Sequence, residues 1–187
     1  MYLHEECSTQ IIHCDIKPQN ILLDEYLTAR ISDFGLAKLL LADQTRAART
    51  GRRGTIGYFA PEWFRKASIS VKVDVYSFGV MLLEIICCKS SVAFAMGNQE
   101  EALMDWAYDC YKKRKLDQLT ENDEEASNDM KGVERLVMVA LWCIQEDASL
   151  RPSMKKVIQM LEGVTEVSVP PYPWNDGSPS SFSVHCQ

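Results

Sequence analysis

The chain has 187 residues, of which 47% are hydrophobic and 25% are charged, as in an ordinary soluble globular domain. Its formal net charge of -6 gives no reason to expect a nucleic acid or an anionic membrane as a partner. The seven cysteines are an odd number without the regular spacing of a disulfide scaffold, so we interpret them as reduced thiols of a cytosolic chain. The longest apolar region, residues 75–88, is too short to span a bilayer, so we expect no direct membrane insertion.

Residues 1–9 have the pattern of the end of a helix, because no helix start signal precedes them. Charged and amide side chains then accompany two short apolar runs, 21–23 and 28–31, which read as paired strands. A hairpin built from these runs brings the two ends of the segment 13–35 together. The segment therefore predicts a site at which several charged groups meet.

The residue types in this segment suit the transfer of a phosphoryl group. Magnesium that accompanies a phosphate donor prefers hard oxygen ligands, which Asp33 and Asn20 can supply. Asp15 is placed to accept the proton of an acceptor hydroxyl, as a carboxylate that binds no metal. Lys17 lies two residues further along an extended backbone, so it projects to the same side as Asp15 and can offset developing charge. Gly35 permits the turn that directs Asp33 into a cleft.

The later part of the chain is predicted to be mainly helical. Residues 38–57 are polar, rich in arginine and without clear periodicity. Apolar residues recur at helical spacing in four segments, which are 73–88, 100–114, 133–144 and 152–161. We expect the first to be a buried central helix in which Gly79 lets a neighbour pack closely. We expect the acidic run 121–129 to be a solvated loop, and the Pro- and Ser-rich segment from residue 168 to be mobile.

Three groups of residues resemble the signature set of eukaryotic protein kinases. These groups are His13-x-Asp15-x-Lys17-x-x-Asn20, Asp33-Phe34-Gly35 and Ala60-Pro61-Glu62. Further stretches, at 57–63, 74–79 and 140–143, are similar to plant receptor-like kinases, especially the lectin-domain group. The resemblance implies a mainly α fold, that of a kinase carboxyl-terminal lobe with a short β-hairpin, with the amino-terminal lobe absent. It implies a partial kinase domain over residues 1–167 and a flexible tail over residues 168–187.

The resemblance also implies an activity, which is transfer of the ATP γ-phosphate to serine or threonine hydroxyls of protein substrates, with Mg2+ as a further cofactor. In this family pattern Asp15 is the catalytic base, and Lys17 stabilises charge and contacts the nucleotide. Asn20 and Asp33 are the magnesium ligands. Leu22 forms an apolar floor under the adenine ring.

Other matched residues would bind the protein substrate or support the structure of the activation segment. Thr55 and Gly57 belong to the substrate-binding part of the activation segment, and Thr55 is expected near Asp15. Glu62 and Arg151 would close an ion pair beneath this segment. The combination of Lys17 with the element 54–55 resembles the serine/threonine-specific pattern and not the tyrosine-specific one.

The resemblance assigns Asp74 to bracing the catalytic loop. His13 can be interpreted as a general base or, as we prefer, as a structural residue that packs near Phe34. Cys14 stands where most family members have Arg, as in the non-Arg catalytic-loop class, and we interpret it as a small buried filler and not as a redox sensor. Four arginines of the activation segment could recognise acidic peptides or a loop phosphate, or could form a solvated face, and the sequence leaves both readings open: Arg46, Arg49, Arg52 and Arg53.

No Gly-rich loop, strand lysine or partner glutamate of a kinase amino-terminal lobe is found in the sequence, so we expect little activity from the isolated chain. The alternative function is a catalytically inactive lobe that serves as an interaction module for the substrates or partners of a kinase. An exposed lobe interface would favour self-association. We expect the chain on the cytosolic side, with plasma-membrane association only as part of a longer receptor kinase.

Overall fold

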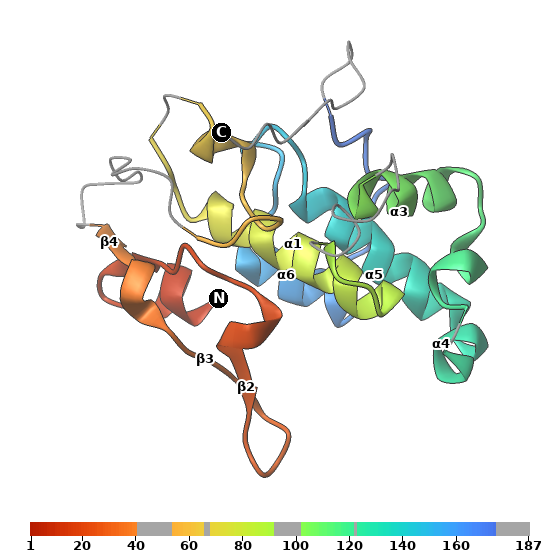
Figure 1. Cartoon of the computed structure of the whole chain (residues 1–187), viewed down its shortest axis with the longest axis horizontal. Helices are drawn as coiled ribbons and strands as arrows, with labels where there is room; N and C mark the ends of the chain where they lie inside the picture. The colour runs from red at the N-terminus through yellow and green to blue at the C-terminus, as the bar shows by residue number, and fades with distance from the viewer. Residues whose placement is uncertain (41–53, 66–67, 92–101, 122, 175–187) are drawn as a thin grey trace.

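The computed structural model describes residues 1–40, 54–65, 68–91, 102–121 and 123–174 of the chain (Figure 1). In order, its elements are η1 (Tyr2–Glu6), β1 (Gln10–Ile12), η2 (Pro18–Asn20), β2 (Ile21–Leu23), β3 (Ala29–Ile31), η3 (Phe34–Leu36), β4 (Lys38–Leu40), η4 (Pro61–Trp63), α1 (Lys72–Cys87), α3 (Leu103–Lys112), η5 (Leu116–Leu119), α4 (Glu124–Asn128), α5 (Met130–Cys143) and α6 (Met154–Leu161). The predicted fold class, mainly α with a short β-hairpin, is confirmed.

Strands β2 and β3 form the predicted antiparallel hairpin, in which Ile21 pairs with Ile31 and Leu23 pairs with Ala29. Asp24 closes its turn, because one carboxylate oxygen accepts the main-chain N–H groups of residues 26 and 28, each at 3.0 Å. The hairpin projects away from the helices (Figure 1). It therefore joins residues 20 and 32 at its base, where the candidate site lies.

Strands β1 and β4 form a second antiparallel pair, from Gln10 opposite Leu40 to Ile12 opposite Lys38. This pairing brings the chain before His13 next to the chain after Phe34. Two strand pairs thus hold both ends of the segment that sequence analysis identified. The short strands do not form one continuous sheet.

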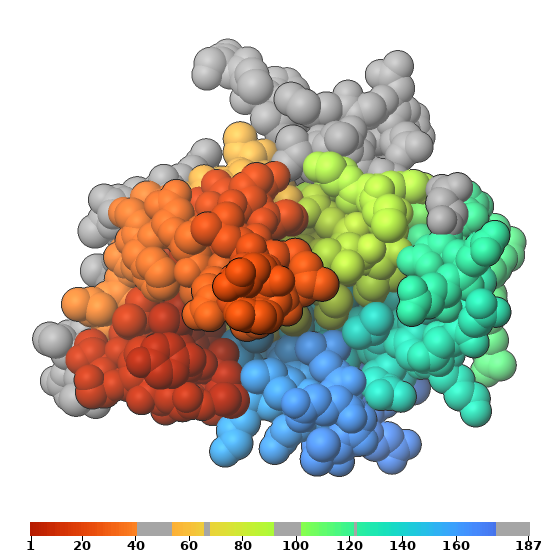
Figure 2. All heavy atoms as spheres, turned by 90° about the horizontal axis from the view of Figure 1, so that it is seen from below, coloured from red at the N-terminus to blue at the C-terminus, as the bar shows by residue number. Residues whose placement is uncertain are grey.

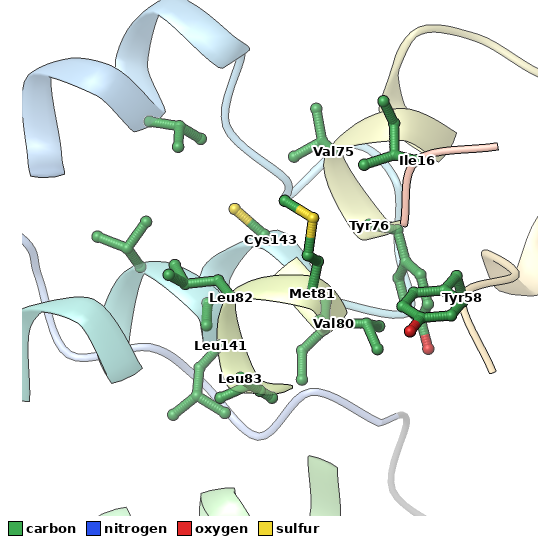
Figure 3. Close-up of a cluster of buried hydrophobic side chains, with 14 of the residues drawn as sticks. Ile16, Tyr58, Val75, Tyr76, Val80, Met81, Leu82, Leu83, Leu141 and Cys143 are labelled. Atoms are coloured by element: carbon green, nitrogen blue, oxygen red, sulfur yellow. The ribbon is translucent and has the colours of Figure 1, made fainter. Parts of the chain in front are cut away.

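Helix α1 is the buried centre of the molecule and packs along α5 (Figure 3). A Cβ atom at Gly79 would lie only 2.6 Å from Cβ of Cys143 and 2.8 Å from Cγ2 of Ile144. The glycine therefore permits the close helix contact that the sequence predicted. Burial also raises the pKa of the Cys143 thiol to about 12, so this side chain stays neutral and acts as a small packing group.

The acidic run after η5 is not the loop that was predicted, because α4 forms within it. Asp123 Oδ1 accepts the Ala126 N–H at 2.9 Å and caps the start of α4. Asp129 Oδ1 accepts the Gly132 N–H at 3.0 Å and caps α5 in the same way. The acidic residues are therefore used in part as helix N-caps, a role that a reading of charge alone overlooks. Among the described residues, no helix is long and apolar enough to cross a membrane.

The described part of the predicted flexible tail, 168–174, is held against the helices. Trp142 Nε1 donates to the Ser168 carbonyl at 2.9 Å, and the Glu146 N–H donates to the Pro173 carbonyl at 2.9 Å. Tyr172 contacts Tyr108 of α3 edge to face, with ring centroids 5.0 Å apart. These contacts join residues 168–174 to α3 and α5, and the predicted mobility of the tail stays a prediction. Residues 175–187 lie outside the described residues.

Candidate active site

Four polar side chains meet at the loop that follows β1. Thr55 Oγ1 donates to Asp15 Oδ1 at 2.8 Å, and Lys17 Nζ lies 2.9 Å from Asp15 Oδ2. Lys17 Nζ also donates to Thr55 Oγ1 at 2.8 Å, so the three groups form a closed triangle. Asn20 Nδ2 donates to the carbonyl of Asp15 at 2.9 Å and to its Oδ2 at 3.1 Å. Residues 38 to 40 positions apart in sequence are thus brought within hydrogen-bonding distance.

The Asp15 carboxyl group is kept ionised by this cluster. Only 7% of Asp15 is exposed, and burial alone would raise its pKa. Hydrogen bonds from Lys17, Thr55 and Asn20, together with the positive charge of Lys17, outweigh burial and lower the pKa below its ordinary value. Asp15 is therefore a carboxylate at neutral pH and can accept a proton.

His13 is packed into the interior with both ring nitrogens engaged by main-chain groups. Its Nε2 lies 2.9 Å from the Ser32 carbonyl, and its Nδ1 accepts the Asp15 N–H at 3.3 Å. Its ring meets the Phe34 ring edge to face at 5.0 Å between centroids. Both ring nitrogens therefore contact main-chain groups, and the structural role of His13 stays a prediction.

Asp33 lies at the turn that precedes η3, with φ 60° and ψ 73° in the left-handed region. Its Oδ1 accepts the Gly35 N–H at 3.2 Å, while the residue is exposed to solvent. Ser32 donates from N and Oγ to the Asn20 carbonyl, at 2.8 and 3.1 Å. The two predicted magnesium ligands, Asp33 and Asn20, are therefore connected through one residue. Leu22 lies on β2 and is 55% exposed.

The loop that carries Thr55 approaches the catalytic loop closely. Gly54 has φ 119°, and a Cβ atom there would lie 2.8 Å from the Cys14 carbonyl oxygen. Gly57 has φ 97°, which also favours glycine. The Tyr58 N–H donates to the Thr55 carbonyl at 3.2 Å and closes the turn. Glycines at both positions thus let the loop place Thr55 against Asp15.

The predicted ion pair beneath this loop is present. Arg151 is only 1% exposed and donates from Nη1 and Nη2 to the two carboxylate oxygens of Glu62, each at 2.8 Å. Arg151 Nε also donates to the Gln145 carbonyl at 2.7 Å. A bidentate pair of this kind fixes orientation as well as distance. It joins the loop to the start of α6.

A second buried link, which the sequence did not predict, lies beneath the same loop. Tyr58 donates from its hydroxyl to Glu84 Oε2 at 2.6 Å, and Ser77 Oγ donates to the Tyr58 carbonyl at 2.8 Å. Burial and the neighbouring Glu84 carboxylate raise the pKa of Tyr58. The signal in the sequence was Glu84 itself, an acidic residue inside an otherwise apolar helix.

The structure describes only part of the activation segment. The four arginines of this segment, 46, 49, 52 and 53, lie outside the described residues. Cys14 lies inside the described loop and is 6% exposed, with φ 69°. Its burial agrees with the interpretation of this cysteine as a small filler.

Comparison with known proteins shows the family of the chain. Residues 1–161 match the model of the protein kinase domain. The chain is 61% identical, over 98% of its length, to the G-type lectin S-receptor-like serine/threonine-protein kinase RLK1 of Arabidopsis thaliana, of which it covers 22%. It is 60% identical, over 92% of its length, to the G-type lectin S-receptor-like serine/threonine-protein kinase LECRK1 of Oryza sativa subsp. indica, of which it covers 21%. The chain thus spans about a fifth of the length of these relatives, and it belongs to the protein kinase domain family.

Proposed function

We propose that the chain carries the catalytic loop of a serine/threonine protein kinase, which transfers the γ-phosphate of ATP to hydroxyl groups of protein substrates. The observation that carries this proposal is the closed triangle of Asp15, Lys17 and Thr55, with contacts of 2.8 to 2.9 Å. An ionised carboxylate beside an ammonium group suits proton removal next to a site where negative charge develops. The names of the relatives support the same activity.

The available oxygen atoms fit a magnesium nucleotide. Asn20 makes both contacts with Asp15 through Nδ2, and among the described residues no hydrogen bond to its Oδ1 is seen. Asp33 is exposed and uses only Oδ1 within the described chain, for Gly35. One carboxylate oxygen and one amide oxygen therefore remain, and both are hard donors that Mg2+ accepts. When bound, magnesium-ATP would supply the phosphoryl group and neutralise part of its charge, with Asn20 and Asp33 as ligands and Leu22 under the adenine.

The side chains of the triangle divide the remaining work. Asp15 orients an acceptor hydroxyl and takes its proton, because its lowered pKa leaves it ionised at neutral pH. Lys17 holds its positive charge 2.9 Å from Asp15 and can stabilise charge on the transferred group. Thr55 contacts both groups, so with Gly57 it can position the acceptor and favour serine or threonine over tyrosine. Four further residues have structural roles in the site, namely His13, Asp74, Glu62 and Arg151.

We infer a setting in receptor-like signalling from the names of the relatives. The chain would lie on the cytosolic side, and attachment to the plasma membrane would come from other parts of a longer receptor kinase. Protein segments that contain serine or threonine would be its substrates. Neither the kinase activity nor the signalling role requires a nucleic acid as a partner.

The test is a chimera in which this chain replaces the aligned segment of the kinase domain of the rice relative LECRK1, hereafter the exchange chimera. Asp15→Asn and Asp33→Ala should each lower incorporation of labelled phosphate into a generic serine/threonine substrate by about a thousandfold, because each removes transition-state stabilisation. Asp24→Asn, at the hairpin turn, is the matched control and should change the rate by less than about threefold.

Two results would contradict the proposal. Near wild-type incorporation with Asp33→Ala would exclude its role as a magnesium ligand. An inactive exchange chimera that still binds acceptor protein would favour the alternative function, an interaction module without catalysis. The binding assay is therefore run on the same samples as the transfer assay.

We also infer that the isolated chain self-associates through the hairpin face. Figure 2 shows this face, on which the β2–β3 hairpin stands toward the viewer. Large apolar side chains are exposed on it and in the turn, namely Leu22, Leu23, Tyr26 and Leu27, at 55, 64, 81 and 77%. Light scattering should show an apparent molar mass that rises with protein concentration. The double variant Leu23→Lys, Leu27→Lys should reduce this rise. A monodisperse wild-type chain would contradict this inference.

A further inference from the structure

Residues 168–174 bind to the helices mainly through their own main chain, in a pattern that the proposed reaction does not use. Three donors at and just after the end of α5 reach three carbonyl groups of this segment. These bonds run from Trp142 Nε1 to Ser168 at 2.9 Å, from Gln145 Nε2 to Pro171 at 3.3 Å, and from the Glu146 N–H to Pro173 at 2.9 Å. Donors that bind carbonyl groups read the course of a main chain more than the identity of its side chains.

Prolines give the segment an extended shape. Pro170 and Pro173 are three residues apart, and both are buried. Each proline fixes its own φ and disfavours helix at the residue before it. Residues 166–172 accordingly lie in neither a helix nor a strand. Two buried prolines at this spacing match the three-residue repeat of a polyproline II helix, whose carbonyl groups stay free to accept hydrogen bonds.

The aromatic side chains of the segment contact α3, beside which the segment lies (Figure 1). The Tyr172 ring meets the Tyr108 ring edge to face, with 5.0 Å between centroids. Trp174 Nε1 donates to Asp105 Oδ1 at 2.5 Å. Carbonyl groups bound by donors, buried prolines and aromatic contacts together are the features by which proteins bind proline-rich peptides.

The donor side of this contact is held in place by the rest of the fold. Gln145 Nε2 also donates to the Leu141 carbonyl at 2.9 Å, and the Gln145 carbonyl accepts from Arg151 Nε at 2.7 Å. The Glu146 carbonyl accepts from Arg151 Nη2 at 3.2 Å. The donors are therefore oriented by α5 and Arg151, so little order has to be created when a segment binds. Tyr172, by contrast, is still 46% exposed in the docked segment.

We propose that the α3–α5 face is a binding site for a partner protein that carries an extended segment with two prolines three residues apart, followed by tryptophan. This face consists of Asp105, Tyr108, Trp142, Gln145 and Glu146. Residues 168–174 fill it within the same chain, so they act as a built-in competitor that the partner displaces. The proposal is independent of phosphoryl transfer, because no residue of this face belongs to the catalytic loop.

The test uses a fluorescent peptide with the sequence of residues 168–174 and blocked ends, and the full 187-residue chain as receiver. Tyr172→Ala together with Trp174→Ala, hereafter the emptied variant, removes both aromatic anchors of the competitor. A tethered segment acts at an effective concentration of about a millimolar, so the emptied variant should bind the peptide at least about tenfold more tightly than wild type. A peptide with alanine in place of both buried prolines should bind about tenfold more weakly, because it is less ordered when free.

A further substitution in the emptied variant tests the face itself. Trp142→Phe removes the Nε1 donor but keeps an aromatic ring, and it should weaken peptide binding about fivefold, the effect of one hydrogen bond. Tyr26→Phe is the matched control, since it also removes a polar atom from an aromatic ring but lies in the hairpin turn, 81% exposed. It should leave the affinity unchanged. Equal affinities of these two variants, or of the two peptides, would overturn the proposal.

Hydrogen exchange at the Glu146 amide gives a second readout, because this N–H group donates to the segment. Exchange should rise about fivefold in the emptied variant and return toward the wild-type rate when peptide is added. The Gly132 amide, which donates to Asp129 at the start of α5, should not change. If both amides exchange faster, the variant is generally destabilised, and the milder Trp174→Phe replaces it in both measurements.

Two results would assign the face differently. No binding at about millimolar peptide, with the Gly132 amide still protected, would show that the face holds its own segment only as part of the fold. Transfer of the segment from wild-type chain to the emptied variant, seen as a dimer, without binding of the free peptide would assign the face to pairing of two copies. Either result would overturn the proposal of a proline-containing partner.

Discussion

The catalytic-loop region and the α1–α5 core are stabilised by different interactions. Around Asp15, charged and polar groups from several short segments contact one another, and the adjoining hairpin leaves its leucines exposed. Between α1 and α5 the contacts are apolar, and side chains such as Val80 and Leu141 are fully buried. Figure 3 shows Ile16 and Tyr58 at one end of this core. Substitutions in the first region should therefore alter chemistry, and substitutions in the second should alter stability.

Buried ionic connections are the exception, because they belong to both regions. Asp74 joins α1 to the catalytic loop, and the Glu62–Arg151 pair joins η4 to the segment that precedes α6. A buried charge whose partner is removed costs much more than an exposed one. The comparison therefore predicts the largest losses of stability at these connections.

Glu62→Gln should give the largest loss of stability. The substitution leaves the guanidinium of Arg151, with 0% of its side chain exposed, without a counter-charge, which costs about 3–5 kcal/mol in the free energy of unfolding. Urea unfolding of the isolated chain measures it. Arg65→Gln is the control, since it breaks an exposed pair with Glu146 and should cost at most about 1 kcal/mol. Equal costs for the two variants would show that burial does not distinguish these pairs.

Gly79→Ala tests the core without changing any charge. The added Cβ would lie 2.6 Å from Cβ of Cys143, so α1 and α5 must separate, at a cost of about 1–3 kcal/mol. Alanine has the higher helix propensity, so propensity alone predicts the opposite sign. Ile85→Ala, at a 62% exposed position of the same helix, should change stability by less than about 0.5 kcal/mol. Catalysis by the folded exchange chimera should be nearly unchanged.

The docked segment 168–174 should contribute less than the core. Trp174 donates from Nε1 to Asp105 Oδ1 at 2.5 Å, and Trp174→Phe removes this bond while keeping an aromatic ring at the position. The expected cost is about 1 kcal/mol, seen as faster proteolysis near the end of the chain and a small fall in Tm. Val169→Ala, at a 75% exposed position, is the control and should change neither measurement. Unchanged proteolysis with Trp174→Phe would mean that the segment is held by other contacts.

Much of this organisation could be predicted because the motifs are local. The spacing from His13 to Asn20 fixes which side chains share one loop, and helical periodicity identifies α1 and α5. Thr55 was placed near Asp15 only through the family resemblance, since nothing within either segment specifies the pairing. The resemblance thus supplied the long-range part of the site.

The contacts that were missed are those between groups far apart in sequence. The sequence pattern placed His4 at the end of a helix, whereas in the structure its ring contacts Asp74. The pattern indicated Glu84 only as a break in an apolar run, whereas its carboxylate accepts a hydrogen bond from Tyr58. A single sequence gives the chemistry of each group but not its partner. The same limit explains the docked segment after residue 168, whose proline and serine content suggested mobility.

The smallest expected effect is a pH dependence that belongs to the site and not to the core. The pKa of Asp15 is lowered in the folded chain, so its ionisation stabilises the fold above the unfolded-state pKa of about 3.9. This contribution is lost as the pH falls through the lowered, folded-state value. Wild type should therefore exceed Asp15→Asn in stability at neutral pH, and the difference should shrink in acid.

Urea unfolding at a series of pH values measures this difference. Gly79→Ala is the matched comparison, because it alters no titratable group and its cost should stay constant over the same range, after correction for changes common to all variants. A difference between wild type and Asp15→Asn that stays constant into acid would show that Lys17, Thr55 and Asn20 do not hold Asp15 in its ionised form. The site would then owe its order to packing, as the core does, and the contrast between the two regions would disappear.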